Sequence, residues 1–307
     1  MATLAGDGDN TYLSDFFNKL TGIGDAQVDL NATLSCGCQN MSSIPSDSEP
    51  AFFVNQPTVL KAKRRLLRMH FESGVGHIGG NLSALDAMLH LHCEVMDEND
   101  LFVLSKGHAA GALYVTLWAQ GLINDEQLST FHKDDTFLAA HPAAHWHRHI
   151  LFATGSLGHG LGLAAGAALG KRLRRQDGTV FCLLSDGECE EGSIWEALLF
   201  AHHQKLANLV ALVDANGLQG FGSTREVASL EPLADKLRGL GLSVLEIDGH
   251  SPAALSAALV KRGDGPQIIV LRTVKGHGVS FMEGKMEWHY LPLEPEQYEQ
   301  ALRELGE

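Results

Sequence analysis

The chain has 307 residues, of which 45% are hydrophobic, so it is long enough for one large α/β domain or two small ones. Its formal net charge of −14 argues against binding to nucleic acid or to an anionic membrane, because both would need a basic surface. The five cysteines form no C-x-x-C pair, and the chain shows neither a signal-peptide pattern nor an apolar run long enough to span a bilayer. We therefore expect a soluble protein of the reducing cytoplasm.

The first 56 residues differ in composition from the rest of the chain. They are rich in Asp, Asn, Ser and Gly, and we expect a partly disordered N-terminal extension over residues 1–56 and one domain over residues 57–307. Cys36 and Cys38 could hold a metal ion, but further ligands are lacking and we expect no site there.

Two histidines follow in glycine-rich surroundings. A basic amphipathic helix predicted from Thr58 leads into residues 73–83, where glycines on both sides of His77 would let its imidazole face a ligand from a loop. The next helix is predicted over residues 84–93. Farther along, a short strand runs into a turn with His108, which can donate to an anion together with the N–H groups of a helix start.

Residues 137–162 combine further histidines with a glycine loop. His141 comes first, and the loop over residues 154–160 opens a predicted helix, whose N-terminus would face an anion. Between them, the alternating histidines from His145 to His149 could bind a metal ion, donate to a phosphate or carboxylate, or form only a polar loop, which is the preferred interpretation.

Two apolar runs, residues 179–184 and 209–213, are typical of buried strands, and the helical pattern between them predicts a βαβ unit. Asp186 and Asn216 would then lie just beyond the carboxyl ends of two parallel strands, where open α/β sheets bind ligands. Their oxygens suit Mg²⁺ or Ca²⁺, and Gly187 would let a phosphate approach the backbone. The alternative is that the Asp-Gly and Asn-Gly pairs are only turns.

Strands predicted at residues 243–247 and 267–271, joined by a helix from Pro252, continue the alternation. The sequence therefore predicts an α/β fold with a doubly wound, mostly parallel sheet and helices on both faces.

Several of these segments together resemble the transketolase family over residues 58–305. The run SDGECEEGSIWEA, followed 30 residues after its aspartate by Asn216, is similar to the thiamine diphosphate motif of that family. Similar segments are G-H-x-G-x-x-L-S from Gly76, L-S-x-G-H-A from Leu104, G-S-L-G-x-G from Gly155 and T-x-K-G-x-G-V-S-x-M-E from Thr273.

The resemblance implies thiamine diphosphate and Mg²⁺ or Ca²⁺ as cofactors. It implies Asp186, Asn216 and the backbone oxygen of Leu218 as metal ligands, and it places Glu191 at a subunit interface. Four histidines would act near the reacting atoms: His77, His108, His141 and His289. Residues expected to contact the cofactor are His77, His108, Gly155, Ser156, Leu157, Gly187, Glu188, Asn216, Lys275 and His289.

The resemblance extends only to the diphosphate-binding domain of the family. No segment resembles the pyrimidine-binding domain, whose glutamate activates the cofactor. The resemblance thus implies the N-terminal subunit of a split transketolase, active only with a separate C-terminal subunit in an expected α₂β₂ assembly. It would transfer a two-carbon ketol unit from a ketose or ketose phosphate to an acceptor.

Departures from the family pattern leave other functions open. His277 replaces a common Lys or Arg, and Tyr290 replaces a Gly, and both changes could alter substrate choice. One alternative is delivery of the two-carbon unit to a lipoyl or acyl carrier protein. A xylulose-phosphate synthase-like reaction is less expected because that enzyme is a single long chain. A non-catalytic scaffold is the third alternative, and the retention of Asp186, Asn216, His77 and His108 argues against it.

Overall fold

The computed structural model describes residues 56–144, 147 and 149–306. These residues lie in the second of two compact units, which spans Ala51–Glu307. Cys36 and Cys38, and the disorder expected for the N-terminal extension, fall outside the described residues. Among the helices of the described part, none combines the length and the apolar character needed to cross a lipid bilayer.

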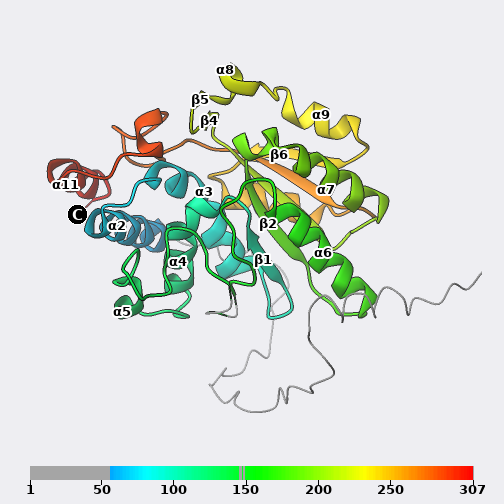
Figure 1. Cartoon of the computed structure of the whole chain (residues 1–307), viewed down its shortest axis with the longest axis horizontal. Coiled ribbons are helices and arrows are strands. Elements are labelled where there is room, and N and C mark those ends of the chain that lie inside the picture. The colour runs from blue at the N-terminus through cyan, green and yellow to red at the C-terminus, as the bar shows by residue number, and fades with distance from the viewer. Residues whose placement is uncertain (1–55, 145–146, 148, 307) are drawn as a thin grey trace, which may run out of the picture. The chain divides into compact units, whose positions relative to one another are not determined.

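A five-stranded sheet lies at the centre of the unit, and all its neighbouring strands are parallel (Figure 1). The strand order is β1-β2-β3-β7-β6. Strands β2 and β3 are mostly apolar and all their residues are buried, as expected for a parallel sheet covered on both faces. The strands are β1 (Leu101–Leu104), β2 (Val180–Ser185), β3 (Leu209–Ala215), β6 (Ser243–Asp248) and β7 (Gln267–Arg272).

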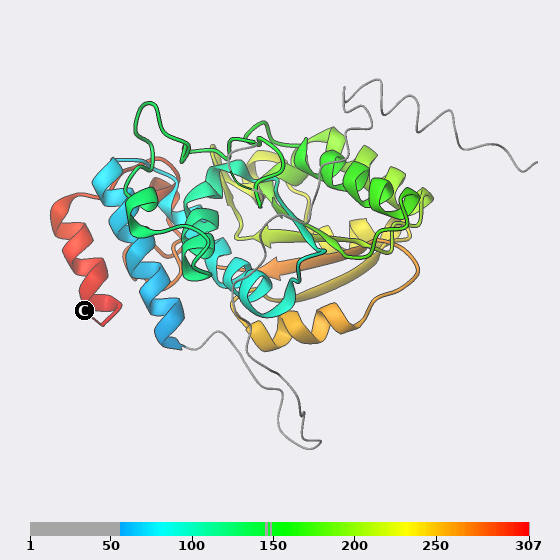
Figure 2. The same ribbon diagram turned by 90° about the horizontal axis from the view of Figure 1, so that it is seen from below.

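Helices cover both faces of this sheet, which confirms the predicted doubly wound fold. Along β2, Phe181 and Leu183 belong to one hydrophobic core, whereas Cys182 and Leu184 belong to the other, because successive strand residues point to opposite faces. In Figure 2 the strands lie between the green α6 and α7 and the gold α10. One core contains α2 (Gln56–Ser73), α3 (Ile78–His90), α4 (Ala110–Ala119), α10 (Pro252–Val260) and α11 (Pro295–Glu304); the other contains α6 (Gly160–Leu173), α7 (Gly192–His203) and α9 (Leu233–Gly239).

Helix α3 is buried along its whole length, and it starts earlier than the sequence predicted. Its first residue is Ile78, so Gly79 and Gly80 lie in the helix and not in the expected loop. A Cβ on Gly79 would lie 3.0 Å from side-chain carbons of Lys275 and Trp288, so a glycine is needed for this close approach. The prediction was wrong because glycines that permit close helix packing look, in sequence, like loop residues.

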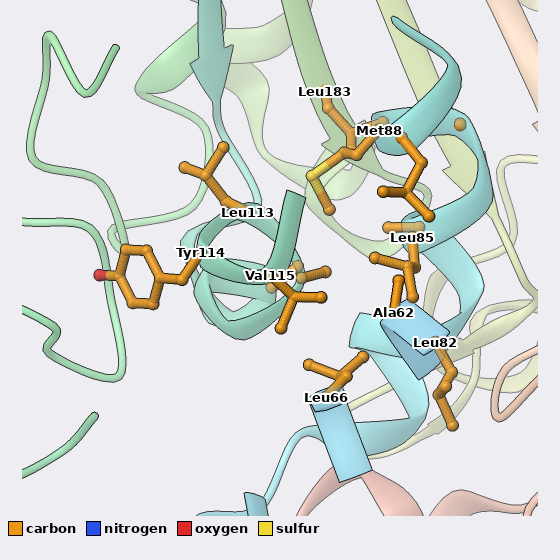
Figure 3. Packing of buried hydrophobic residues seen from close by; sticks show 14 of the residues in the cluster. Ala62, Leu66, Leu82, Leu85, Met88, Leu113, Tyr114, Val115 and Leu183 are labelled. Atoms are coloured by element: carbon orange, nitrogen blue, oxygen red, sulfur yellow. The ribbon is translucent and has the colours of Figure 1, made fainter. Parts of the chain in front are cut away.

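The first core is built largely by α2, α3 and α4 against the sheet. Figure 3 shows Leu66 of α2 near Leu82 of α3 and Met88 of α3 next to Leu183 of β2, and Val115 of α4 belongs to the same core. All five side chains are fully buried, and burial of each one contributes about 1.5–3 kcal/mol to folding. The packing fixes the position of α3, whose N-terminal end carries part of the site described below.

Shorter elements connect the layers. The register of β2 and β3 pairs Ser185 with Asp214, so the residues that follow both strands meet at one edge of the sheet. The short elements are the π-helix η1 (Leu91–Val95), the 3₁₀ helices η2 (Gly107–Ala109), η3 (Gly187–Glu190) and η4 (Met286–His289), the helices α5 (Asp125–Leu128) and α8 (Thr224–Ala228), and the antiparallel pair β4 (Leu218–Gln219) and β5 (Gly222–Ser223).

Candidate active site

A cavity of about 500 Å³ lies at the carboxyl ends of the parallel strands. His108 follows β1, Asp186 follows β2, Asn216 follows β3 and Lys275 follows β7, so four strands contribute to its walls. This edge is where open α/β sheets bind ligands. The predicted site residues that line the cavity are His77, His108, His141, Gly155, Leu157, Asp186, Gly187, Asn216, Leu218, Lys275 and His289.

Four histidines gather on one side of the cavity. The ring centroid of His77 lies 5.5 Å from that of His108, 5.2 Å from that of His289 and 6.3 Å from that of His141. The buried side chain of Asn81 fixes two of them, because its amide donates to the carbonyl oxygens of His77, at 2.8 Å, and His108, at 3.0 Å. His77 itself has a φ of 66°, a left-handed conformation, at the residue that precedes α3.

The histidines of this group are neutral near pH 7. Burial lowers the pKa of His77 to about 4, and the nearby His141 and the ammonium groups of Lys275 and Lys106 add to the effect. Burial and Lys275 likewise lower the pKa of His289 to about 3. Burial also holds the pKa of His108 well below its ordinary value. Each ring can therefore both donate and accept a hydrogen bond.

Lys275 places an ammonium group between the histidines and the oxygen donors. Its Nζ donates to Nδ1 of His289 at 2.8 Å and lies 3.4 Å from the carbonyl oxygen of Leu218. Burial, followed by the charge of Lys106, lowers its pKa to about 8, so the group is mostly charged at pH 7. Both of these contacts are to uncharged atoms, and the ammonium is suited to bind an anion in the cavity.

Three kinds of oxygen donor line the other side. The carboxylate of Asp186 accepts from Gly187 N at 2.8 Å and Gly217 N at 2.6 Å, and the amide oxygen of Asn216 accepts from Leu218 N at 3.1 Å. Burial and the neighbouring Asp214 raise the pKa of Asp186 to about 6. A divalent cation would stabilise this buried carboxylate, and carboxylate, amide and carbonyl oxygens are donors that Mg²⁺ and Ca²⁺ prefer. These residues fit a metal ion.

Two glycines that line the cavity, Gly155 and Gly187, leave no space for a side chain. Gly155 has a φ of 142°, and a Cβ there would lie 2.8 Å from Cδ2 of His141. A Cβ on Gly187 would lie 2.7 Å from Cβ of Gln219. Side chains are therefore excluded at both positions, and backbone groups face the cavity, as in other phosphate sites.

Two predicted cofactor contacts are not in the cavity lining. Ser156 is exposed beside the lining residues of its loop. Glu188 is fully buried, and its carboxylate accepts from Ser105 Oγ, from Gly158 N at 3.0 Å and from Ser185 N at 3.3 Å. Glu188 therefore stabilises the glycine loop through the N–H of Gly158 and does not line the cavity. Glu191, which was predicted for assembly, does line the cavity.

The departures from the family pattern fall in different places. Tyr290 lines the cavity, and its hydroxyl donates to the carbonyl oxygen of Gly220 at 2.7 Å. His277 lies outside the cavity lining and faces Asp86 and Glu283 instead. Of the histidine segment, His145 is outside the described residues, whereas the rings of His147 and His149 lie 5.3 Å apart and do not line this cavity.

Some residues that shape the site were not identified from the sequence. Besides Asn81, these are Lys106 and Asp214, which are both fully buried and form an ion pair beneath the cavity. Lys106 follows the buried strand β1, and Asp214 lies within the buried strand β3. A charge in that position must be paired, because an isolated buried charge is costly, and this signal could have identified both.

Comparison with known proteins gives the family. A model of the family described as "Transketolase, thiamine diphosphate binding domain" matches residues 76–307. An apulose-4-phosphate transketolase subunit of Phocaeicola vulgatus is 38% identical over 259 residues, which cover 80% of this chain and 92% of that protein. The 6-deoxy-6-sulfo-D-fructose transketolase subunit SqwG of a Clostridium species is 39% identical over 76% of this chain and 89% of that protein.

Larger transketolases match over a smaller share of their length. Human transketolase is 36% identical over 76% of this chain but only 39% of its own length. The transketolase structure from Leishmania mexicana superposes with a TM-score of 0.76 at 25% identity, covering 82% of this chain and 41% of that one. The chain thus spans about two fifths of these proteins. The chain belongs to the transketolase family and contains its thiamine diphosphate-binding domain.

Proposed function

We propose that this chain is the diphosphate-binding subunit of a two-component transketolase, which moves a two-carbon ketol unit from a ketose or ketose phosphate to an aldose. The observation that carries the proposal is the cavity itself. It combines the oxygen donors Asp186, Asn216 and Leu218 with a lysine ammonium and four histidines. The relatives of this chain that are named as transketolase subunits match it over about nine tenths of their own length. This match supports the role of a transketolase subunit for this chain.

The cofactors are thiamine diphosphate and a divalent cation, Mg²⁺ or Ca²⁺. Asp186, Asn216 and the carbonyl oxygen of Leu218 would hold the cation, and Lys275 and the backbone at Gly155 and Gly187 would face the diphosphate. When bound, thiamine diphosphate supplies the carbanion chemistry that makes and breaks the carbon–carbon bond. The protein's part is to bind, orient and protect the reacting groups.

The histidines would handle protons around the substrate. Because His77, His108 and His289 are neutral, each can donate a hydrogen bond to an oxygen that gains negative charge, or accept a proton from a hydroxyl. Lys275 fixes the tautomer of His289: its ammonium donates to Nδ1, so the proton of the neutral ring is on Nε2. Nε2 is the nitrogen available to a substrate oxygen.

A separate C-terminal subunit would complete the site by supplying the pyrimidine-binding domain and its activating glutamate. Apolar side chains at the mouth of the cavity support a protein partner there, since Phe221 is 87% exposed and Val227 is 42% exposed. We propose an α₂β₂ assembly.

We also propose that residues 1–56 form an extension to the domain over residues 57–307. We further propose a cytoplasmic location for the protein, which the free thiols of Cys93, Cys182 and Cys189 support.

A mixing assay tests the proposal. The chain is assayed alone and with the candidate partner, in the presence of thiamine diphosphate and Mg²⁺. The donor is xylulose 5-phosphate and the acceptor ribose 5-phosphate, with apulose 4-phosphate and 6-deoxy-6-sulfofructose as further donors. We expect a ketose product only in the mixture, and none with Asp186→Ala. The control is Asp248→Ala, which removes an exposed carboxylate at the end of another strand, β6, outside the cavity lining.

Two other outcomes would contradict the proposal in different ways. If the mixture cleaves a ketose donor but transfers nothing to an aldose, the acceptor is not a sugar and delivery to a carrier protein takes its place. If neither the chain nor the mixture binds thiamine diphosphate, the catalytic role itself is wrong.

A further inference from the structure

We propose that the buried carboxylate of Asp214 sets the direction of the Asn216 side-chain amide, so that its oxygen and not its nitrogen is presented to the metal ion. The inference rests on the proposed function, in which Asn216 is a metal ligand. An asparagine amide can be turned by half a rotation with little change in shape, and only its hydrogen-bond partners decide which end faces a ligand. Asp214 is therefore a positioning residue.

The carboxylate of Asp214 is held in place by donors from three other parts of the fold. Its Oδ2 accepts from Lys106 Nζ, beyond β1, and from Ser83 Oγ of α3 at 2.6 Å. Its Oδ1 accepts from the hydroxyl of Thr273, which follows β7. The contact with Lys106 is an ion pair, and Asp214 and Lys106 have no solvent exposure. The position of the carboxylate is thus fixed by α3 and by residues that follow two of the strands whose ends form the cavity.

Asn216 is constrained at both ends of its amide. Its Nδ2 lies 3.5 Å from Asp214 Oδ2 and 3.4 Å from Ser83 Oγ. A carboxylate only accepts hydrogen bonds, and the Ser83 hydroxyl directs its hydrogen to Asp214, so both atoms offer lone pairs to Nδ2. The other end, Oδ1, accepts from Leu218 N at 3.1 Å.

The reversed amide would be unfavourable at the contacts with Asp214 and with Leu218. It would place Oδ1 against the Asp214 carboxylate and an NH₂ group against the N–H of Leu218, so repulsion would replace each hydrogen bond. An amide nitrogen has no lone pair to offer a cation, and a reversed Asn216 would remove one metal ligand. Lys106 allows the carboxylate of Asp214 to be buried near that of Asp186. Without the Lys106 ammonium, Asp214 would be a second uncompensated buried charge beside Asp186.

The test measures metal affinity. The assembled enzyme is titrated with Mg²⁺ at saturating thiamine diphosphate, and binding is followed by calorimetry. Asp214→Asn alone would leave Lys106 unpaired, so the main variant is Lys106→Met combined with Asp214→Leu, since replacing a buried ion pair by apolar residues often preserves stability. We expect this double variant to fold, with its melting temperature as the check, and to bind Mg²⁺ roughly 10–100-fold more weakly, the usual cost of losing an outer-shell partner.

A rescue separates orientation from general damage. Adding Asn216→Asp to the double variant should restore Mg²⁺ affinity, because a carboxylate presents an oxygen whichever way it is turned. The gain should exceed the gain from Asn216→Asp in the wild-type background. The matched control is Thr273→Val, which removes a hydrogen bond to Oδ1, the Asp214 oxygen that does not face Asn216, and should change the dissociation constant by less than about threefold.

The inference is overturned if the double variant binds Mg²⁺ as the wild type does, or if Asn216→Asp gives the same change in both backgrounds. Failure of the wild-type enzyme itself to bind Mg²⁺ with thiamine diphosphate would overturn the proposed function and, with it, the metal-ligand role of Asn216.

Discussion

Helix α3 connects two groups of histidines that differ in their neighbours. The first group, His77, His108 and His289, lies at the N-terminal end of α3 and lines the cavity. The second group is Asp86 of α3 with His250, which follows β6, and His277, which follows β7. The rings of His250 and His277 stack with a centroid distance of 3.6 Å.

The neighbours of each group decide what its imidazoles can do. The rings of His77, His108 and His289 are neutral mainly because they are buried, and the ammonium of Lys275 adds to this effect. In the second group, Nδ1 of His250 lies 2.8 Å from Asp86 Oδ2, and its Nε2 accepts from the N–H of Val274 at 2.9 Å. Both nitrogens are therefore in use, and His250 connects α3 to the segment that carries Lys275.

The second group could be mistaken for a metal site. One ligand atom from each of its three residues lies within 4.8 Å of the others. However, the N–H of Val274 occupies the lone pair of His250 Nε2, which leaves the proton on Nδ1, the atom that faces Asp86. Lys63 Nζ also lies 3.5 Å from Asp86 Oδ1. A cation would have to displace both contacts, so proximity of ligand types does not by itself make a site.

Substitution of a histidine in the first group, for which we propose a role in proton transfer, should have the largest effect on activity. We choose His77→Asn, because asparagine tolerates the left-handed backbone conformation at this position. The loss of a proton donor and acceptor should lower kcat about 10²–10⁴-fold, whereas the melting temperature should stay close to that of the wild type. Steady-state kinetics of the assembled enzyme measure this change, and a kcat within about threefold of the wild type would contradict the assigned role.

Titration of His77 tests whether its surroundings lower its pKa, as expected for the first group of histidines. Its pKa of about 4, compared with 6.5 for the unfolded chain, means that the folded protein resists protonation of this ring. Its contribution to stability is therefore complete above pH 6.5 and is lost as the pH falls towards 4. Nuclear magnetic resonance of labelled histidine, assigned by the His77→Asn spectrum, should give a midpoint near pH 4. Lys275→Met should raise that midpoint, and an unshifted wild-type midpoint near 6.5 would show that the ring is not shielded.

The second group should matter for stability more than for catalysis. His250→Leu removes the hydrogen bonds to Asp86 and Val274, and we expect the free energy of unfolding in urea to fall by about 2 kcal/mol. Its effect on kcat should be much smaller than that of His77→Asn. The control is His277→Leu, which removes a ring that is 32% exposed and should cost less than about 1 kcal/mol. Equal losses in the two variants would contradict the role of the His250 hydrogen bonds.

Much of the fold and of the site could be predicted because it depends on residues close in sequence. Apolar runs that end in Asp-Gly and Asn-Gly predicted β2 and β3, and the parallel sheet then brought Asp186 and Asn216 to one edge. The glycine motifs predicted the family, which the comparisons confirm. The start of α3 was missed, since Gly79 is required by packing against Trp288 and not by a turn.

The sequence by itself determined the alternation of strands and helices, the family and the set of chemical groups at the strand ends. Only the tertiary structure decided how those groups are oriented and charged. Ser83 and Asp214 are separated by 131 residues, and Lys106 and Asp214 by 108, yet together they set the direction of one amide. Hydrogen-bond geometry and burial depend on neighbours in space, and no local pattern of residues contains that information.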